Sequence, residues 1–205
     1  LDFSCSTCHT ADQHEVRGSR YTPEAVDEGA IGIPGRKGAD RATCRACHGA
    51  TPHDSGAKLN DHTDKIACQT CHIPLFSRGD YGSKMWWDWS TAGKVGADGK
   101  QISTEDADGF EVYNSKKGDF EWEKHTVPEY RWFNGTVLYT LLEDRIDPTG
   151  VVPVNQFLGD PGTPGTRIWP VKIMRGKQPY DVELQTLVAP LTTTDKGYWK
   201  TLDWD

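Results

Sequence analysis

One five-residue pattern, Cys-x-x-Cys-His, occurs three times in the first 72 residues of this chain, at 5–9, 44–48 and 68–72, and contains all six of its cysteines. The pattern is typical of c-type haem attachment. Its two thiols bond to the two vinyl groups of the porphyrin, and the next residue, histidine, is placed to bind the iron. The sequence therefore predicts three covalently attached haem c groups. They would be held by Cys5, Cys8, Cys44, Cys47, Cys68 and Cys71, with His9, His48 and His72 as proximal iron ligands.

Other uses of paired cysteines explain the pattern less well. A disulfide framework does not require a histidine after every second cysteine. Zinc sites use Cys-x-x-Cys pairs, but three pairs do not divide into four-cysteine sites, and the adjacent histidine is poorly placed to share a metal ion with both thiols. A thioredoxin-like motif would occur once, in a βαβ setting. Because haem c is attached outside the cytoplasm and consumes the thiols, we expect no disulfide and a periplasmic, cell-surface or extracellular location.

Four histidines remain as candidates for the distal side of the irons: His14, His53, His62 and His125. His14 and His53 each follow a motif histidine by five residues, which is a short span for reaching the far face of the same haem. We therefore expect each of them to bind a neighbouring haem. His62, six residues before Cys68, can serve either neighbour. His125 lies far from the motifs, where an exposed surface residue is the simpler interpretation.

Methionine is the rival distal ligand, and Met/His ligation raises the reduction potential of a haem. The chain has two methionines, Met85 and Met174, and each lies in an aromatic or basic stretch where a packing role is expected. We therefore predict bis-histidine ligation and low potentials, with His14, His53 and His62 as the distal ligands.

Composition divides the chain near residue 80. Residues 1–80 contain all three motifs but only three of the 21 Trp, Tyr and Phe residues, too few for an ordinary hydrophobic core. We expect a multihaem cytochrome c fold in which this part is a haem-cored module of short helices and loops, with the porphyrins supplying the apolar surface. Residues 81–205 carry the other aromatic residues and no cysteine. We expect them to form a haem-free, irregular region with short β-hairpins, packed on the haem module.

Turn signals and alternating apolar residues predict where those hairpins lie. Strands are expected at 110–113, 120–123 and 167–174, the last one at an edge because Pro170 cannot donate a hydrogen bond. The Asn134-Gly135 pair between 130–133 and 136–140 is the strongest hairpin signal. Further turns are expected at Asp98-Gly99, Asp108-Gly109 and Lys117-Gly118.

Charge and hydropathy exclude some classes of partner. The net charge is −7, which argues against a nucleic-acid partner because phosphate contacts need clustered Lys and Arg. The sequence contains no run of 18 apolar residues, so no transmembrane helix is predicted. The chain starts at Leu1 without a signal sequence, so we expect a mature or truncated form. Basic residues that are candidates to pair with haem propionates, unless they are simply solvated, are Arg36, Lys37, Arg45, Lys58 and Lys65.

Several longer runs resemble one family of multihaem cytochromes. They are residues 59–63, 67–74, 84–90, 132–136, 168–170 and 174–180. These runs resemble the C-terminal, last-three-haem part of the octahaem tetrathionate reductase family. The resemblance implies that His14, His53 and His62 match distal-ligand positions. The family's substrate-reducing haem lies in its N-terminal half, to which nothing here corresponds, so tetrathionate reduction is not implied. The chain is either a natural trihaem relative or a fragment of a longer multihaem protein.

Three functions are compatible with these features. The first is an electron carrier with three closed, bis-histidine haems, acting with other redox proteins or with copies of itself, including as a subunit of an extracellular cytochrome filament. The second is a reductase of small sulfur or nitrogen oxyanions at an open haem, with His125 and nearby lysines as site residues. The third is a structural or binding module whose haems serve mainly as core. The ligand count favours the first, so we expect an electron carrier rather than an enzyme.

Overall fold

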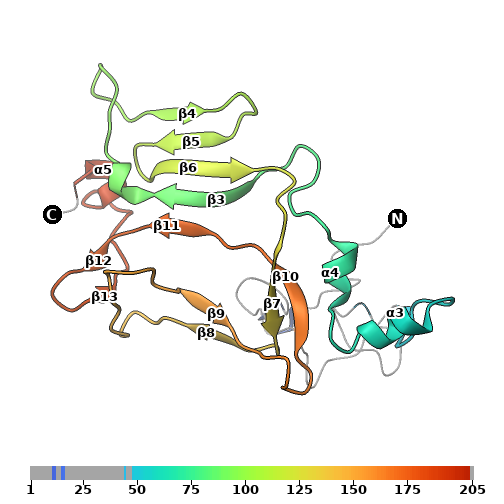
Figure 1. The fold of residues 1–205 in the computed structure, drawn as a ribbon. Coiled ribbons are helices and arrows are strands. Elements are labelled where there is room, and N and C mark those ends of the chain that lie inside the picture. Colours follow the sequence, from blue (N-terminus) through green and yellow to red (C-terminus); the bar gives the residue numbers. More distant parts are fainter. Residues whose placement is uncertain (1–10, 13–14, 17–43, 45–47, 204–205) are drawn as a thin grey trace. The chain divides into compact units, whose positions relative to one another are not determined.

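The structure of the chain is a computed structural model that describes residues 11–12, 15–16, 44 and 48–203 (Figure 1). Two compact units share the chain, and their segments alternate along the sequence. The motif unit consists of Leu1–Pro74, Tyr130–Tyr139 and Asn155–Val171, and the sheet unit of Leu75–Glu129, Thr140–Val154 and Lys172–Asp205. The boundary expected near residue 80 stays a prediction. No helix in the described part of the chain is long and apolar enough to cross a membrane.

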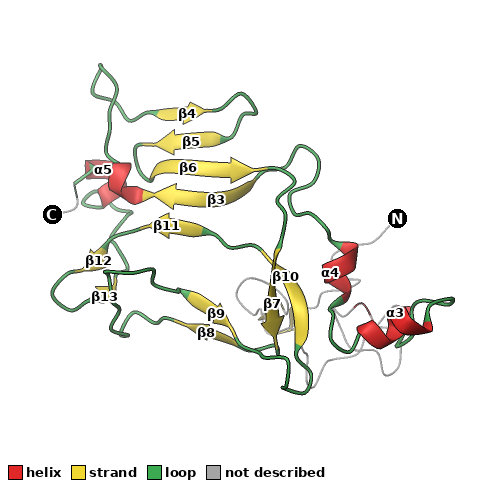
Figure 2. Cartoon of the chain, in the orientation of Figure 1, coloured by secondary structure: helices red, strands yellow, loops and turns green. Residues whose placement is uncertain are grey.

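The described part of the motif unit contains two short helices, α3 (Ala57–His62) and α4 (Cys68–His72), neither of which has a buried residue. Its strands are β7 (Glu129–Phe133), β8 (Val137–Tyr139), β9 (Asn155–Phe157) and β10 (Arg167–Val171), with the two-residue pair β1 (Ala11–Asp12) and β2 (Glu15–Val16) (Figure 2). The short helices expected in residues 1–80 are confirmed in the described part of that range by α3 and α4.

Helix α4 is attached to strand β10 by backbone hydrogen bonds. Ile168 lies opposite Ile66 in an isolated parallel bridge, and its N–H donates to the carbonyl oxygen of Lys65 at 2.8 Å. The Ile168 carbonyl accepts from the Ala67 N–H at 3.0 Å, at the N-cap position of α4. It also accepts from the Thr70 hydroxyl, on α4 itself, at 2.7 Å. The helix carrying the third motif is thereby fixed against a strand about a hundred residues further along the chain.

The hairpin expected around Asn134-Gly135 is wrong. Strand β7 pairs with β10, and β8 pairs antiparallel with β9. A two-residue hairpin of the type favoured by Asn-Gly needs positive φ at both central residues, but of this pair only Gly135 has one, 95°. The Asn134 N–H instead donates to the carbonyl of Leu158 at 2.7 Å, and the Leu158 N–H to the carbonyl of Thr136 at 3.0 Å. The β8–β9 ladder therefore continues past the turn.

Three aromatic rings connect the strands of the motif unit. Phe133 on β7 is buried, and its ring centroid lies 4.6 Å from that of Phe157 on β9 and 5.9 Å from that of Trp169 on β10, edge-on. Edge-on and offset arrangements are those that aromatic pairs prefer. The prediction of a strand near 167–174, limited to an edge by Pro170, is confirmed, since β10 belongs to a two-stranded sheet.

A five-stranded sheet dominates the sheet unit, in the order β11–β3–β6–β5–β4 (Figure 1). The strands are β3 (Ser83–Asp88), β4 (Ser103–Glu105), β5 (Glu111–Asn114), β6 (Gly118–Glu123) and β11 (Arg175–Lys177). Only the β11–β3 pairing is parallel. The strands predicted at 110–113 and 120–123 are confirmed as β5 and β6. Outside the sheet lie η1 (Trp89–Thr91), the pair β12 (Tyr180–Asp181) and β13 (Thr186–Leu187), and α5 (Tyr198–Thr201).

The tryptophan-rich stretch that follows the third motif forms β3, an interior strand of this sheet, because bulky aromatic residues suit a pleated, half-buried surface. The backbone of β11 lies so close to the Trp87 ring that a Cβ at Gly176 would come within 2.3 Å of it. On β3 the ammonium of Lys84 lies 3.4 Å from the ring centroid of the buried Phe120. Burial, together with the charge of Lys117, lowers the pKa of Lys84.

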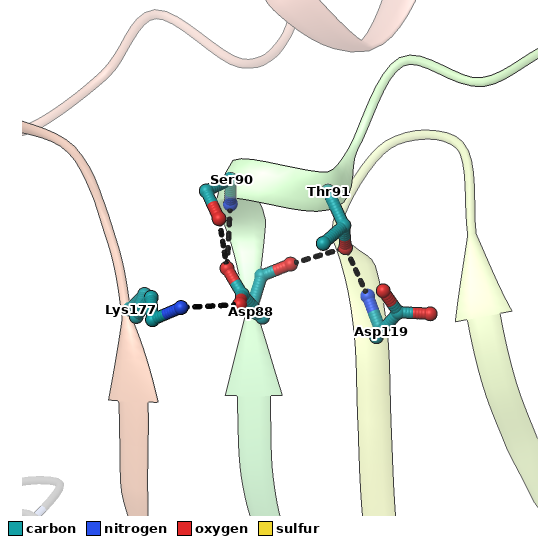
Figure 3. A network of polar contacts seen from close by, with 5 residues as sticks. All are labelled: Asp88, Ser90, Thr91, Asp119 and Lys177. Carbon is teal, nitrogen blue, oxygen red and sulfur yellow. Dashed lines mark hydrogen bonds and ion pairs between the residues drawn. The ribbon is translucent and has the colours of Figure 1, made fainter.

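A polar network joins β3 to both of its neighbours (Figure 3). The carboxylate of Asp88 accepts hydrogen bonds from the N–H and hydroxyl of Ser90 and from the ammonium of Lys177 on β11, the last at 3.0 Å. The Asp88 carbonyl accepts from the Thr91 hydroxyl, which in turn accepts from the N–H of Asp119 on β6. Burial alone would raise the pKa of Asp88, but the hydrogen bonds from Ser90 and Lys177 outweigh it and hold that pKa below its usual value.

Candidate functional site

Helix α4 is the third Cys-x-x-Cys-His motif, so one turn of helix positions all of its reactive groups. Cys68 and Cys71 are three residues apart and lie on one face of the helix. Cys71 and His72 are exposed, Cys68 is half-buried, and neither thiol is part of a disulfide. Pro74, two residues after the helix, disfavours its continuation. The two thiols and the imidazole are thus presented at the surface of the motif unit.

His53 faces the motif histidine. The imidazole centroids of His53 and His72 are 6.1 Å apart, and the two ring planes are within 14° of parallel. His53 precedes α3 by four residues and begins the turn that leads into it, in which the Gly56 N–H donates to the His53 carbonyl at 3.3 Å. The structure therefore brings a histidine preceding α3 to the motif histidine that ends α4.

Asn60 on α3 holds His53 by three contacts. Its side-chain NH₂ donates to the His53 carbonyl at 3.0 Å, and its Oδ1 accepts from the His53 N–H at 3.1 Å. The same Oδ1 lies 3.2 Å from Nδ1 of the His53 ring. This oxygen can only accept, so in the neutral tautomer that makes this contact a hydrogen bond, Nδ1 carries the proton and Nε2 keeps its lone pair. Outer contacts of this kind orient histidines that bind metals.

The spacing of the two rings fits a metal ion between them. Metal–imidazole bonds are about 2 Å long, and a ring centroid lies about 1 Å behind its nitrogen, so two imidazoles on opposite sides of one ion have centroids about 6 Å apart. The observed 6.1 Å has this value. The two rings are also stacked, and an offset stack falls in the same range of distances.

Among the histidines that the structure describes, none of the others predicted from the sequence is paired in this way. His48 is exposed, as is Cys44 in the same motif, and His62 is the exposed last residue of α3. His125 belongs to the sheet unit, where it is exposed, has a φ of 53° and donates its N–H to the Ser77 carbonyl at 2.9 Å. Predicted site residues outside the described part of the chain are Cys5, Cys8, His9, His14 and Cys47.

Lys65, one of the basic residues named as candidates to pair with a propionate, contacts a loop of the motif unit. Its ammonium donates to the Pro161 carbonyl at 2.9 Å. The neighbouring carboxyl of Asp160 has a pKa held below its usual value by the hydrogen bond from Thr163, by that from the Gly162 N–H and by the charge of Lys65. This contact adds a second attachment between the α3–α4 segment and the loop that precedes β10.

Comparison with known proteins identifies the relatives of both halves of the sequence. Residues 84–205 match the family model described as bacterial cytochrome c, and residues 1–77 match that of cytochrome c7 and related cytochrome c. No curated protein matches. Among solved structures, an octahaem cytochrome c from Shewanella oneidensis is similar with a TM-score of 0.80 and 38% sequence identity. The match covers 99% of this chain and 42% of the octahaem chain, and it confirms the resemblance to octahaem cytochromes c.

Proposed function

This chain belongs to the bacterial cytochrome c family, and we propose that it is a trihaem electron carrier with bis-histidine haems. It is a multihaem c-type cytochrome, and proteins of this kind carry covalently attached haem c. Haem iron supplies one-electron chemistry by changing between its ferric and ferrous states. The residues of this chain would attach the haems, orient their axial ligands and exclude other ligands from the iron.

The pairing of His53 with His72 is the observation that carries the proposal. Cys68 and Cys71 would attach the third haem, His72 would bind its iron on the proximal side, and His53 would bind it on the distal side. The 6.1 Å centroid separation and the near-parallel ring planes support this assignment. The contact from Asn60 supports it further, because it leaves Nε2 of His53 available. A haem with two protein ligands has no open position for a substrate, which favours electron transfer over catalysis.

The first two motifs are assigned by the same logic from the sequence. Cys5, Cys8 and His9 would hold the first haem and Cys44, Cys47 and His48 the second, with His14 and His62 as their distal ligands. The haem-cored part of the chain would span residues 1–80 and the haem-free part residues 81–205. The absence of buried residues from α3 and α4 supports a porphyrin core there, since helices this short need something to pack against.

The competing function is reduction of a small sulfur or nitrogen oxyanion at an open haem. It has the octahaem relative in its favour, but this chain spans only 42% of that protein. The two functions differ in the spin state of the iron, because an open position leaves a high-spin ferric haem, whereas two histidines give a low-spin one. Added sulfite or nitrite would change the ferric spectrum of a reductase and leave that of a closed carrier unchanged.

A histidine substitution tests the proposed pairing. We expect His53→Ala to convert one of three ferric haems from low spin to high spin, as measured by electron paramagnetic resonance, and to allow cyanide to bind there. His125→Ala is the matched control and should leave the spectrum as in the wild type. A fully low-spin His53→Ala protein with its complete haem content would contradict the pairing.

The proposed partners follow from the ligation of the haems. A haem whose iron has two protein ligands exchanges electrons only through the edge of its porphyrin. We propose other redox proteins or further copies of this chain as donors and acceptors, and an exported location, because haem c is attached outside the cytoplasm. Assembly of copies into an extracellular filament is the fullest form of this proposal. Electron microscopy of the purified holoprotein tests it: ordered polymers support a filament, and a single monomeric species contradicts it.

A further inference from the structure

We infer that the guanidinium of Arg167 binds a haem propionate in the motif unit. Arg167 is the first residue of β10 and is half-buried. Its Nε is buried, and no hydrogen-bond acceptor lies within reach of it in the described part of the chain. A buried guanidinium N–H without a partner is unfavourable, and a cation is expected to pair when it leaves water. Nε of Arg167 therefore lacks an acceptor among the described residues, and an anion would supply one.

The strand places this cation beside the third motif. The residue that follows Arg167 is Ile168, whose N–H and carbonyl bond to the backbone of Lys65 and Ala67, on the N-terminal side of α4. The same carbonyl accepts the Thr70 hydroxyl within the motif helix. The backbone of Arg167 is consequently held next to a haem-attachment helix by hydrogen bonds on both sides of its neighbour. A haem attached to this helix would supply the missing anion.

A propionate suits the site chemically. Arginine presents a planar set of N–H donors that matches the two oxygens of a carboxylate, and this pairing is stronger than a neutral hydrogen bond. Each attached haem brings two such carboxylates into a part of the chain that holds three motifs. Lys65, a basic residue close to the third motif, donates to the Pro161 carbonyl. The inference rests on the haem attachment proposed above, but not on which histidine is the distal ligand.

The test measures the haems of the intact holoprotein. In Arg167→Gln, we expect one of the three midpoint potentials to move to a lower value, because loss of a nearby positive charge favours the more positive, ferric haem. The propionate bending band in the resonance Raman spectrum should shift at the same time. Arg167→Lys should keep the potential close to that of the wild type while still shifting the Raman band, since it retains the charge but not the planar fork.

Arg175→Gln is the matched control, because this exposed arginine of the sheet unit loses the same charge. Its potentials and propionate bands should remain those of the wild type. If Arg167→Gln and Arg167→Lys both retain three haems with unchanged potentials and unchanged bands, the inference is wrong, whereas the proposed electron carrier would stand. If the wild type itself lacks three attached haems, the proposed function fails first. Lower thermal stability with unchanged haem spectra would assign Arg167 to a protein carboxylate instead and would also overturn the inference.

Discussion

Asn60 offers a way to weaken one proposed distal ligand, His53, without removing it. Its side chain makes three contacts to His53, two to the backbone and one to the imidazole, between 3.0 and 3.2 Å. Asn60→Ala removes all three and leaves the His53 ring without its orienting partner. We expect the variant to retain three haems and to bind His53 to the iron less firmly.

The contacts set the size of the expected effect. A net hydrogen bond contributes about 0.5–1.5 kcal/mol to the free energy of unfolding. Asn60 and His53 are both half-buried, and the two backbone contacts together should contribute about 1–3 kcal/mol. Loss of an outer partner of a metal-bound histidine typically weakens metal binding about 10- to 100-fold. This corresponds to about 1.4–2.8 kcal/mol in the equilibrium between bound and detached His53.

Cyanide titration of the ferric protein measures this equilibrium. Cyanide and His53 compete for one coordination position, so the apparent affinity for cyanide rises by the factor by which His53 binding falls. We expect one of three haems to bind cyanide about 10- to 100-fold more tightly in Asn60→Ala. Asn60→Asp keeps an oxygen acceptor for Nδ1 and should stay close to the wild type. Asn155→Ala, an exposed asparagine on β9, serves as the control.

The reasoning would be refuted by a simple result. If Asn60→Ala folds with three haems and its cyanide affinity lies within about twofold of the wild type at every haem, Asn60 does not orient an iron ligand. The His53–His72 arrangement would then be an offset stack of two rings.

Three further predictions concern the rest of the molecule. Asp88→Asn should lower the free energy of unfolding by about 1–3 kcal/mol at neutral pH. Because the pKa of Asp88 is depressed in the folded protein, its stabilising contribution is present above the unfolded pKa near 3.9 and is lost as the pH falls through the folded pKa. Acid denaturation followed by circular dichroism should therefore depend less on pH in the variant than in the wild type. Gly118→Ala should destabilise the sheet unit by more than about 2 kcal/mol, because a Cβ there would lie 1.9 Å from the Asp88 carbonyl oxygen and the backbone φ is 78°. Gly109 has a similar φ of 81° but open space around it, so Gly109→Ala should lower the free energy of unfolding by only about 1–2 kcal/mol. Denaturant titrations measure both variants. Replacing Cys68 and Cys71 together by alanine should prevent attachment of the third haem. Amide hydrogen exchange should then rise in α3 and α4, while the five-stranded sheet stays protected. Unchanged exchange in the two helices would contradict this prediction.

The haem chemistry was accessible from the sequence because the motif is local. Two thiols and a histidine within five residues define attachment wherever the helix lies, and α4 has the expected short helical form. Distal ligands are not local in this sense. His53 and His72 are nineteen residues apart in the sequence, and only the folding of α3 and α4 brings their rings to 6.1 Å. Nothing in the sequence indicated a role for Asn60 beside a histidine, apart from its place in a run that resembles the octahaem family.

The strands show the same distinction. Those closed by a local turn, β5 and β6, were predicted, because Gly118 adopts a left-handed φ that few other residues tolerate. The turn at Asn134-Gly135 was also predicted, but the partners of the strands on either side of it were not. Leu158, more than twenty residues later, takes the hydrogen bonds that a local hairpin would have used. Likewise, the tryptophan-rich segment becomes an interior strand because it pairs with β11, about ninety residues further along the chain.

The central claim is that three haems are attached and that every iron is closed by two histidines. It is tested most directly by near-infrared magnetic circular dichroism of the ferric holoprotein, whose charge-transfer bands distinguish His/His from His/Met ligation and from high-spin iron, after mass spectrometry has counted the attached haems. The account predicts three haems and a spectrum of low-spin His/His centres alone. A different number of haems, a high-spin fraction that responds to added oxyanion, or a His/Met band would contradict it.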